Sequence, residues 1–245
     1  MHTVNLICNH KSCSEDNTNS RTDRTSPYIE IIYGYDPLCG WCFGFSSHLE
    51  RIRKEFGREI TFSLINGGIF SGQRKVPMRS ISEHIQRNMP NVTSLTGAEF
   101  GNDFLNLLQK GDYSYDSEKS SVALTVFREL LPEHVFSFAA SIQNAFFRQG
   151  KDLNDDYTFV ELISPYQIEK EIYLQKLNSL EYKAKTLKEF SKAARYNLSY
   201  PSLLMQHPDG EEFLSAGFEP ADIIIKRIKR KLEEINYLST HESTY

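Results

Sequence analysis

Residues 28–48 read YIEIIYGYDPLCGWCFGFSSH, and this stretch decides how the rest of the chain is interpreted. The β-branched and aromatic run at its start predicts a buried strand. Gly34 and Pro37 interrupt that run, as residues that end a strand do. Cys39 and Cys42 then open a segment with helical spacing. A strand, a turn, a CxxC pair and a helix in this order are typical of a thioredoxin-like redox unit.

The composition narrows the class of protein. A chain of 245 residues with 40 % hydrophobic and 24 % charged residues is typical of a soluble globular protein. A net charge of -4 argues against binding to nucleic acid or anionic lipid. No apolar run approaches the ~20 residues that span a bilayer, and the N-terminus lacks the pattern of a secretory signal. We therefore expect a cytoplasmic protein, in which a CxxC pair is catalytic or metal-binding rather than a structural disulfide.

The periodicity of the chain predicts an α/β fold. A helix over 43–56 and a strand over 60–65 complete a βαβ unit after the first strand. Residues 73–179 carry helical spacing broken by Pro and Gly, and an amphipathic helix with Leu177, Leu180, Ala184, Leu187 and Ala194 on its apolar stripe ends near Tyr196. Two strands follow, an apolar one at Pro201 or just after it that ends at Gln206 and a partner over 211–216, and a closing helix with Pro220 at its first position comes last. The order is βαβ, helical block, helix, ββα.

This order predicts four parts of the chain. Residues 1–27 are polar and without periodicity, and we expect a flexible tail. Residues 28–72 and 180–238 form the two halves of one thioredoxin-like domain, and residues 73–179 form a helical domain inserted between them. Residues 239–245 form a C-terminal tail.

The chemistry of the central stretch follows from its place at a helix start. A helix N-terminus has unpaired backbone N–H groups and a positive dipole end, which stabilise a thiolate. Cys39 is therefore the predicted attacking thiolate, and Cys42, one turn further on, the resolving thiol that breaks the mixed disulfide. Trp41 offers an aromatic surface beside them. We interpret Asp36 as a turn residue rather than a proton shuttle, and Asn66, Gly67 and Gly68 as a turn beside the site.

The residues around the CxxC pair resemble those of a known protein family. The segment DPLCGWCFGF at residues 36–45 is similar to the active-site segment of DsbA-family thiol–disulfide oxidoreductases, in particular their predicted cytoplasmic disulfide-isomerase branch. Residues 66–68 (NGG), Thr96, Gly97 and Phe100, and residues 115–117 (YDS) also resemble that branch. The likeness spans about residues 28–235. It implies a thioredoxin fold with a helical insertion, and a cis-proline at Pro201 that faces the CxxC pair and docks an extended substrate together with Tyr200.

The resemblance implies a function with named residues. Cys39 and Cys42 are the predicted catalytic pair, and Trp41, Tyr200 and Pro201 bind a protein or peptide substrate. No organic cofactor or metal is expected, and glutathione is a possible reductant. The oligomeric state stays open.

Two other functions remain as alternatives. One is a glutathione-dependent transferase or isomerase of the kappa class, which typically uses a single Ser or Cys. The other is a non-enzymatic protease adaptor that responds to redox state or zinc. Cys8 and Cys13 lie in the predicted tail. They are plain exposed thiols, an auxiliary redox pair, or zinc ligands shared with Cys39 and Cys42.

Overall fold

A computed structural model describes residues 28–241, with side chains through Ile235. Its centre is a four-stranded sheet in the order β2-β1-β5-β6. β1 and β2 run parallel, whereas β1–β5 and β5–β6 are antiparallel. The strands are β1 (Glu30–Tyr35), β2 (Thr61–Asn66), β5 (Ser202–His207) and β6 (Gly210–Ala216). This sheet is built from both ends of the chain, as the predicted βαβ and ββα halves require.

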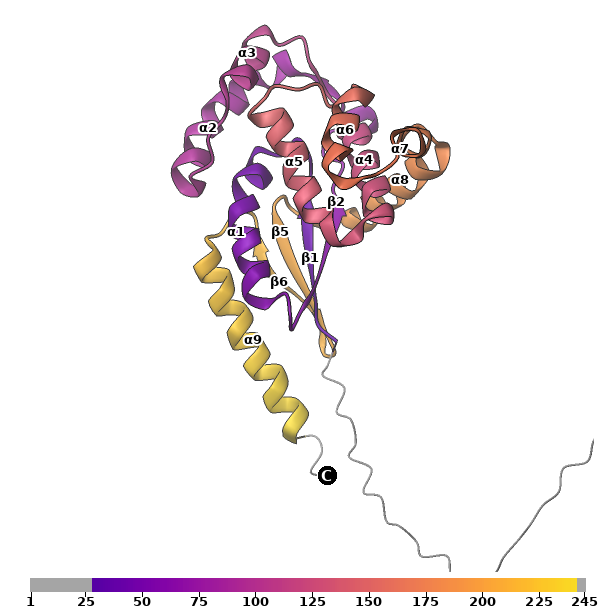
Figure 1. Cartoon of the computed structure of the whole chain (residues 1–245). Coiled ribbons are helices and arrows are strands. Elements are labelled where there is room, and N and C mark those ends of the chain that lie inside the picture. The colour runs from indigo at the N-terminus through magenta and orange to yellow at the C-terminus, as the bar shows by residue number, and fades with distance from the viewer. Residues whose placement is uncertain (1–27, 242–245) are drawn as a thin grey trace, which may run out of the picture.

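Each face of the sheet is covered by helices. α1 (Gly40–Phe56) and α9 (Ala221–His241) pack on one face, and α8 (Leu180–Arg195) packs on the other (Figure 1). The two faces follow from the alternation of side chains along a strand. Ile31 and Tyr33 belong to the large core that includes α1, whereas Ile32 joins Ala193 of α8 in a second cluster. α9 continues through residues 239–241 of the predicted C-terminal tail.

The segment between the two halves is mainly helical and covers one end of the sheet (Figure 1). Its α-helices are α2 (Ser82–Thr96), α3 (Asn102–Lys110), α4 (Ser117–Leu130), α5 (Val135–Phe147), α6 (Asp156–Ile163) and α7 (Lys170–Leu177). Two short strands that were not predicted, β3 (Val76–Pro77) and β4 (Ser114–Tyr115), pair with each other. The predicted fold class, a thioredoxin-like α/β fold with a large helical insertion, is confirmed.

The predicted apolar stripe of α8 is wrong. Leu180 is 85 % exposed and Leu187 is 41 % exposed, and Leu177 belongs to α7. The buried face of α8 instead carries Tyr182, Thr186, Phe190 and Ala193. Its buried polar atoms are hydrogen-bonded: the Thr186 hydroxyl donates to Tyr182 O at 2.9 Å. This pairing lets a polar residue occupy a core position that the hydrophobic pattern does not reveal.

No helix within residues 28–241 is long and apolar enough to cross a membrane.

Candidate active site

The N-terminus of α1 holds the first cysteine of the CxxC pair. Cys39 is the N-cap residue, and its sulfur accepts a hydrogen bond from the backbone N–H of Cys42 at 3.4 Å. The first turn of α1 contains no acidic residue, so no carboxylate offsets the partial positive charge of the helix end. The helix charge is also complemented at its other end, where Arg53 and Lys54 lie in the last turn. The half-buried Cys39 sulfur thus lies where a helix attracts negative charge.

The second cysteine is in a different environment. Cys42 is fully buried, and burial raises the pKa of its thiol well above the ordinary value. The neighbouring Cys39 raises the pKa of Cys42 further through a hydrogen bond and through its charge. Both cysteines are free thiols in the structure. Of the two sulfurs, Cys39 is the one that a substrate can reach.

The structure brings Pro201 to the CxxC pair from the far end of the chain. The Tyr200–Pro201 peptide bond is cis, as the family resemblance implied. The Cys39 thiol donates to the carbonyl oxygen of Tyr200 at 3.5 Å. β5 begins directly after Pro201 and pairs with β1, with Gly34 opposite Ser202. A Cβ at Gly34 would lie 2.6 Å from the Ser202 hydroxyl, so glycine is what lets the two strands approach here.

The Asn66–Gly68 turn makes room for the ring of Tyr200. A Cβ at Gly67 would lie 2.2 Å from Cζ of Tyr200. A Cβ at Gly68, where φ is +60°, would meet the ring of Phe190 at 2.6 Å. The predicted turn beside the site is therefore also a surface that seats a candidate substrate-binding residue.

An ion pair on the other face of the sheet holds this turn in place. Arg128 and Glu189 pair through both guanidinium NH2 groups, each at 2.8 Å. The carboxylate of Glu189 also accepts from the backbone N–H of Asn66 at 3.0 Å and from its amide at 3.2 Å. Arg128 donates in addition to Leu64 O at 2.8 Å. The end of β2 is thus fixed by side chains of α4 and α8.

Asp36 has a larger role than the predicted turn residue. Its fully buried carboxylate accepts hydrogen bonds from Leu38 N at 3.0 Å, Ile69 N at 2.7 Å and the Ser117 hydroxyl at 2.9 Å. Burial raises the pKa of Asp36 to about 6, although these hydrogen bonds oppose the rise. Its carbonyl oxygen also accepts from Cys39 N at 3.1 Å. Asp36 therefore ties the CxxC loop to the loop after β2 and to the start of α4.

An aromatic group lies beside the CxxC pair. The ring of Trp41 packs on Phe218, with centroids 5.9 Å apart. Phe218 also contacts the ring of His48 edge to face at 5.1 Å. His48 Nδ1 accepts a hydrogen bond from the backbone N–H of Ala221 at 3.2 Å, which caps the start of α9. His48 is thus a packing residue that joins α1 to α9.

The structure groups the candidate site residues and adds others. Cys39, Cys42, Tyr200 and Pro201 meet at the end of β1, and Trp41 lies on the adjoining surface. Within the described part of the chain, no group of three or more His, Cys, Asp or Glu residues could hold a metal ion. Cys8 and Cys13 lie outside the described residues, so their predicted roles stay open.

The comparison with known proteins rests on solved structures. No protein-family model matches the chain, and no curated protein matches it. A Nitrosomonas europaea protein, described as "a putative protein disulfide isomerase", superposes with a TM-score of 0.72 at 26 % identity, over 87 % of this chain and 99 % of that one. The cytosolic disulfide reductase DsbM from Pseudomonas aeruginosa superposes with a TM-score of 0.69 at 21 % identity, over 83 % of this chain and 98 % of that one.

These likenesses cover nearly the whole length of both relatives and include the helical insertion. The chain has a DsbA-like thioredoxin fold with a CxxC pair at the start of α1. The predicted resemblance to DsbA-like thioredoxin-fold oxidoreductases is confirmed.

Proposed function

We propose that this chain reduces or isomerises disulfides in proteins or peptides through Cys39 and Cys42. One observation carries the proposal. The accessible Cys39 sulfur lies between the N-terminus of α1 and the carbonyl oxygen of Tyr200, while its partner Cys42 is buried one turn further on. This asymmetry supports attack by Cys39 and resolution by Cys42.

The reaction has two exchange steps. The thiolate of Cys39 attacks one sulfur of the substrate disulfide, so that a mixed disulfide forms and the other substrate sulfur leaves as a thiolate. Cys42 then loses its proton and attacks the Cys39 sulfur. The bond between Cys39 and the substrate breaks, the second substrate sulfur leaves, and the Cys39–Cys42 disulfide remains. In isomerisation, a second thiol of the same substrate resolves the mixed disulfide in place of Cys42.

The surroundings of Cys39 favour a peptide substrate. Tyr200 presents backbone beside the attacking sulfur, and the Trp41–Phe218 pair offers an apolar surface next to it. We infer that Trp41, Tyr200 and Pro201 contact the substrate chain. Aromatic rings that are half-buried before binding contribute contact area at a low entropy cost.

We propose glutathione as the reductant that returns the Cys39–Cys42 disulfide to the dithiol. Support comes from DsbM, which has also been solved with GSH, at 22 % identity to this chain and a TM-score of 0.67. The same relative is described as cytosolic, which supports a reducing compartment for this chain.

The test is the glutathione-driven reduction of a disulfide-bonded protein. We expect the wild-type chain to accelerate it, Cys39→Ser to abolish the acceleration, and Trp41→Ala to weaken it for the protein but not for a small aromatic disulfide. A wild-type rate equal to the uncatalysed rate would refute the proposed function. Equal losses with both substrates in Trp41→Ala would refute the substrate role of Trp41.

A further inference from the structure

The resolving step requires a negative charge on the Cys42 sulfur, but the buried position of Cys42 makes that charge unfavourable. Cys42 is fully buried, and burial is the main reason for the raised pKa of its thiol. The proton of Cys42 must nevertheless leave before its sulfur attacks Cys39. A buried thiolate needs a hydrogen-bond donor and a route for the departing proton.

Tyr33 supplies a hydroxyl at this place. The residue is on β1, beneath α1, and its ring contacts Phe45, one turn beyond Cys42, with centroids 5.9 Å apart. Tyr33 is 2 % exposed, and its hydroxyl has no hydrogen-bond partner of good geometry among the described residues. After burial, the neighbour with the largest effect on the pKa of Tyr33 is Cys42. An unpaired buried hydroxyl is costly to keep, which points to a use for it.

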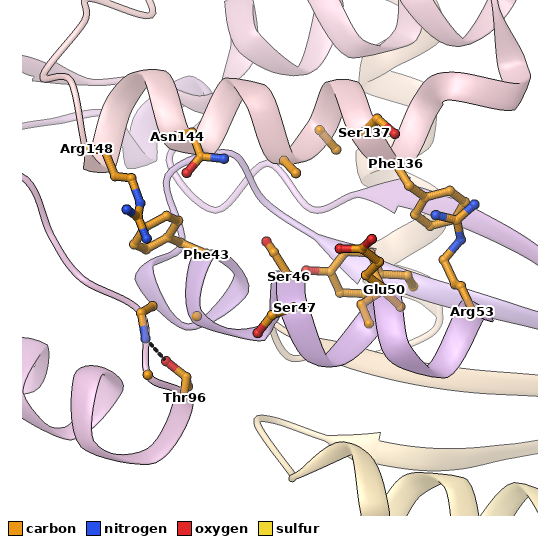
Figure 2. A pocket seen from close by; sticks show the side chains of 17 residues that line it. Phe43, Ser46, Ser47, Glu50, Arg53, Thr96, Phe136, Ser137, Asn144 and Arg148 are labelled. Carbon is orange, nitrogen blue, oxygen red and sulfur yellow. Dashed lines mark hydrogen bonds between the residues drawn. The ribbon is translucent and has the colours of Figure 1, made fainter. Parts of the chain in front are cut away.

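A pocket connects this hydroxyl region with solvent. It has a volume of about 550 Å³ and lies between α1 and α5, and Tyr33 is the strand residue among those that line it. Figure 2 shows Ser46 and Glu50 of α1 facing α5 across the pocket, with Arg148 at one end and Arg53 at the other. A pocket of this size and polarity holds water. Tyr33 thus borders a pocket that holds water, on a side of α1 that Trp41 does not line.

Other ionisable groups near the site are less suitable. Besides Cys42, the titratable groups that face Tyr33 are Tyr35 and Cys39, and the pocket adds Glu50 and Arg53 of α1 and Arg148 of α5. The Tyr35 hydroxyl already donates to Ala139 O at 2.9 Å. The Asp36 carboxylate accepts from three donors on other segments. The hydroxyls of Tyr113, Ser121, Ser202 and Ser215 are also buried without a partner, but these residues do not line the pocket. Of Tyr33 and Tyr35, the two buried tyrosines whose pKa Cys42 raises, Tyr33 is the one with an unpaired hydroxyl.

We propose that Tyr33 positions and stabilises the Cys42 thiolate in the resolving step, and that the α1–α5 pocket takes up the proton. In the resolving step, Cys42 S–H turns toward the Tyr33 oxygen, and Tyr33 O–H turns toward pocket water. The proton of Cys42 passes to Tyr33 as the proton of Tyr33 passes to water. Tyr33 ends neutral, with its O–H donating to the Cys42 thiolate, which then attacks Cys39. This role rests on the proposed function.

The test separates the two exchange steps with 5,5'-dithiobis(2-nitrobenzoic acid). Attack by Cys39 releases one coloured thionitrobenzoate in a phase that depends on reagent concentration. Resolution by Cys42 releases a second thionitrobenzoate in a phase whose rate is independent of reagent concentration. The full-length chain carries Cys8→Ser and Cys13→Ser, so that only the site thiols report. Tyr33→Phe removes the free hydroxyl, and Tyr35→Phe is the matched control on the same face of the same strand.

We expect Tyr33→Phe to slow the second phase by about 10- to 100-fold, the range for losing one hydrogen bond to a charged sulfur. The rate of the first phase and the thermal midpoint of Tyr33→Phe should not fall, because the hydroxyl that it loses was unpaired. The pH at which the second phase reaches half its maximal rate should rise. Tyr35→Phe should lower the thermal midpoint and leave the second phase unchanged.

Each contrary outcome has one meaning. Equal second phases in Tyr33→Phe and the parent, a first phase slowed as much as the second, or an equal slowing in Tyr35→Phe would overturn the role of Tyr33. The proposed function would stand in those cases. A parent chain that releases a single thionitrobenzoate, with no second phase, would instead overturn the assignment of Cys42 as the resolving thiol.

Discussion

Asp36 should make the stability of this protein fall as pH rises through the weakly acidic range. Its carboxyl is fully buried, and burial raises its pKa from 3.8 to about 6. The folded protein therefore holds this proton more tightly than the unfolded chain does. The Asp36 contribution to the free energy of unfolding is greatest below the unfolded pKa and declines until the pH exceeds the folded pKa. With about 1.4 kcal/mol for each pKa unit, the decline is about 3 kcal/mol.

The Asp36→Asn variant isolates this contribution, because asparagine does not titrate. Asparagine also loses one of the accepting oxygens that serve Leu38, Ile69 and Ser117, but that loss is independent of pH. The free energy of unfolding, from urea titrations at a series of pH values, should therefore fall in the wild type relative to the variant by about 3 kcal/mol between about pH 3 and about pH 7.

Asp156→Asn is the control with the opposite sign. Burial alone would raise the pKa of Asp156, but hydrogen bonds from Lys119 and Asn178 outweigh burial, so the pKa lies below its ordinary value. The wild type should thus gain stability relative to Asp156→Asn as pH rises. The reasoning about Asp36 would be refuted if the difference in the free energy of unfolding between wild type and Asp36→Asn did not change with pH. It would also be refuted if that difference rose with pH, as is expected for Asp156→Asn.

Three further changes probe the parts that position the site. Gly67→Ala should displace the Tyr200 ring and lower the free energy of unfolding by about 1–3 kcal/mol through overpacking. This loss should be smaller in a Tyr200→Ala background, and an equal loss in both backgrounds would show that the new Cβ does not meet the ring. Glu189→Gln should cost about 2–3 kcal/mol in urea unfolding, since it removes the negative charge that pairs with Arg128 and one of the two oxygens that serve Arg128 and the Asn66 backbone. The exposed Lys229–Glu55 pair is the control, and Glu55→Gln should leave stability unchanged. Burial lowers the pKa of His48, and Arg51 adds to this, so the wild type should lose stability relative to His48→Gln as pH falls through about 6.5; a constant difference would contradict the neutral acceptor role of His48.

The sequence predicted those parts of the site that lie next to each other in the chain. The strand before Cys39, the CxxC pair and the helix after it follow from local patterning. Pro201 was placed opposite the pair only by the family resemblance, because periodicity alone does not say which strand neighbours β1. Once the register is known, Gly34 opposite Ser202 explains how that approach is possible.

The supporting residues could not be predicted, because their partners are distant in sequence. Glu189 reaches Asn66 across 123 positions, and Ser117 reaches Asp36 across 81. Nothing local distinguishes Glu189 from the other charged residues of α8. The apolar stripe of α8 was misassigned for a related reason: Thr186 can lie in the core because Tyr182 O accepts a hydrogen bond from its hydroxyl. By its local sequence Tyr33 is one more aromatic strand residue. It is distinguished by three features together: an unpaired hydroxyl, Cys42 as a neighbour and a place in the lining of the α1–α5 pocket.

The most direct test of the central assignment traps the covalent intermediate. Cys39→Ser and Cys42→Ser chains are incubated with a disulfide-bonded peptide, and the adducts are identified by mass spectrometry without reductant. The accessible Cys39 and the buried Cys42 predict that Cys42→Ser accumulates a mixed disulfide through Cys39, whereas Cys39→Ser forms none at the site. Equal adducts in both variants, or an adduct at Cys42 alone, would contradict the assignment of Cys39 as nucleophile and Cys42 as resolving thiol.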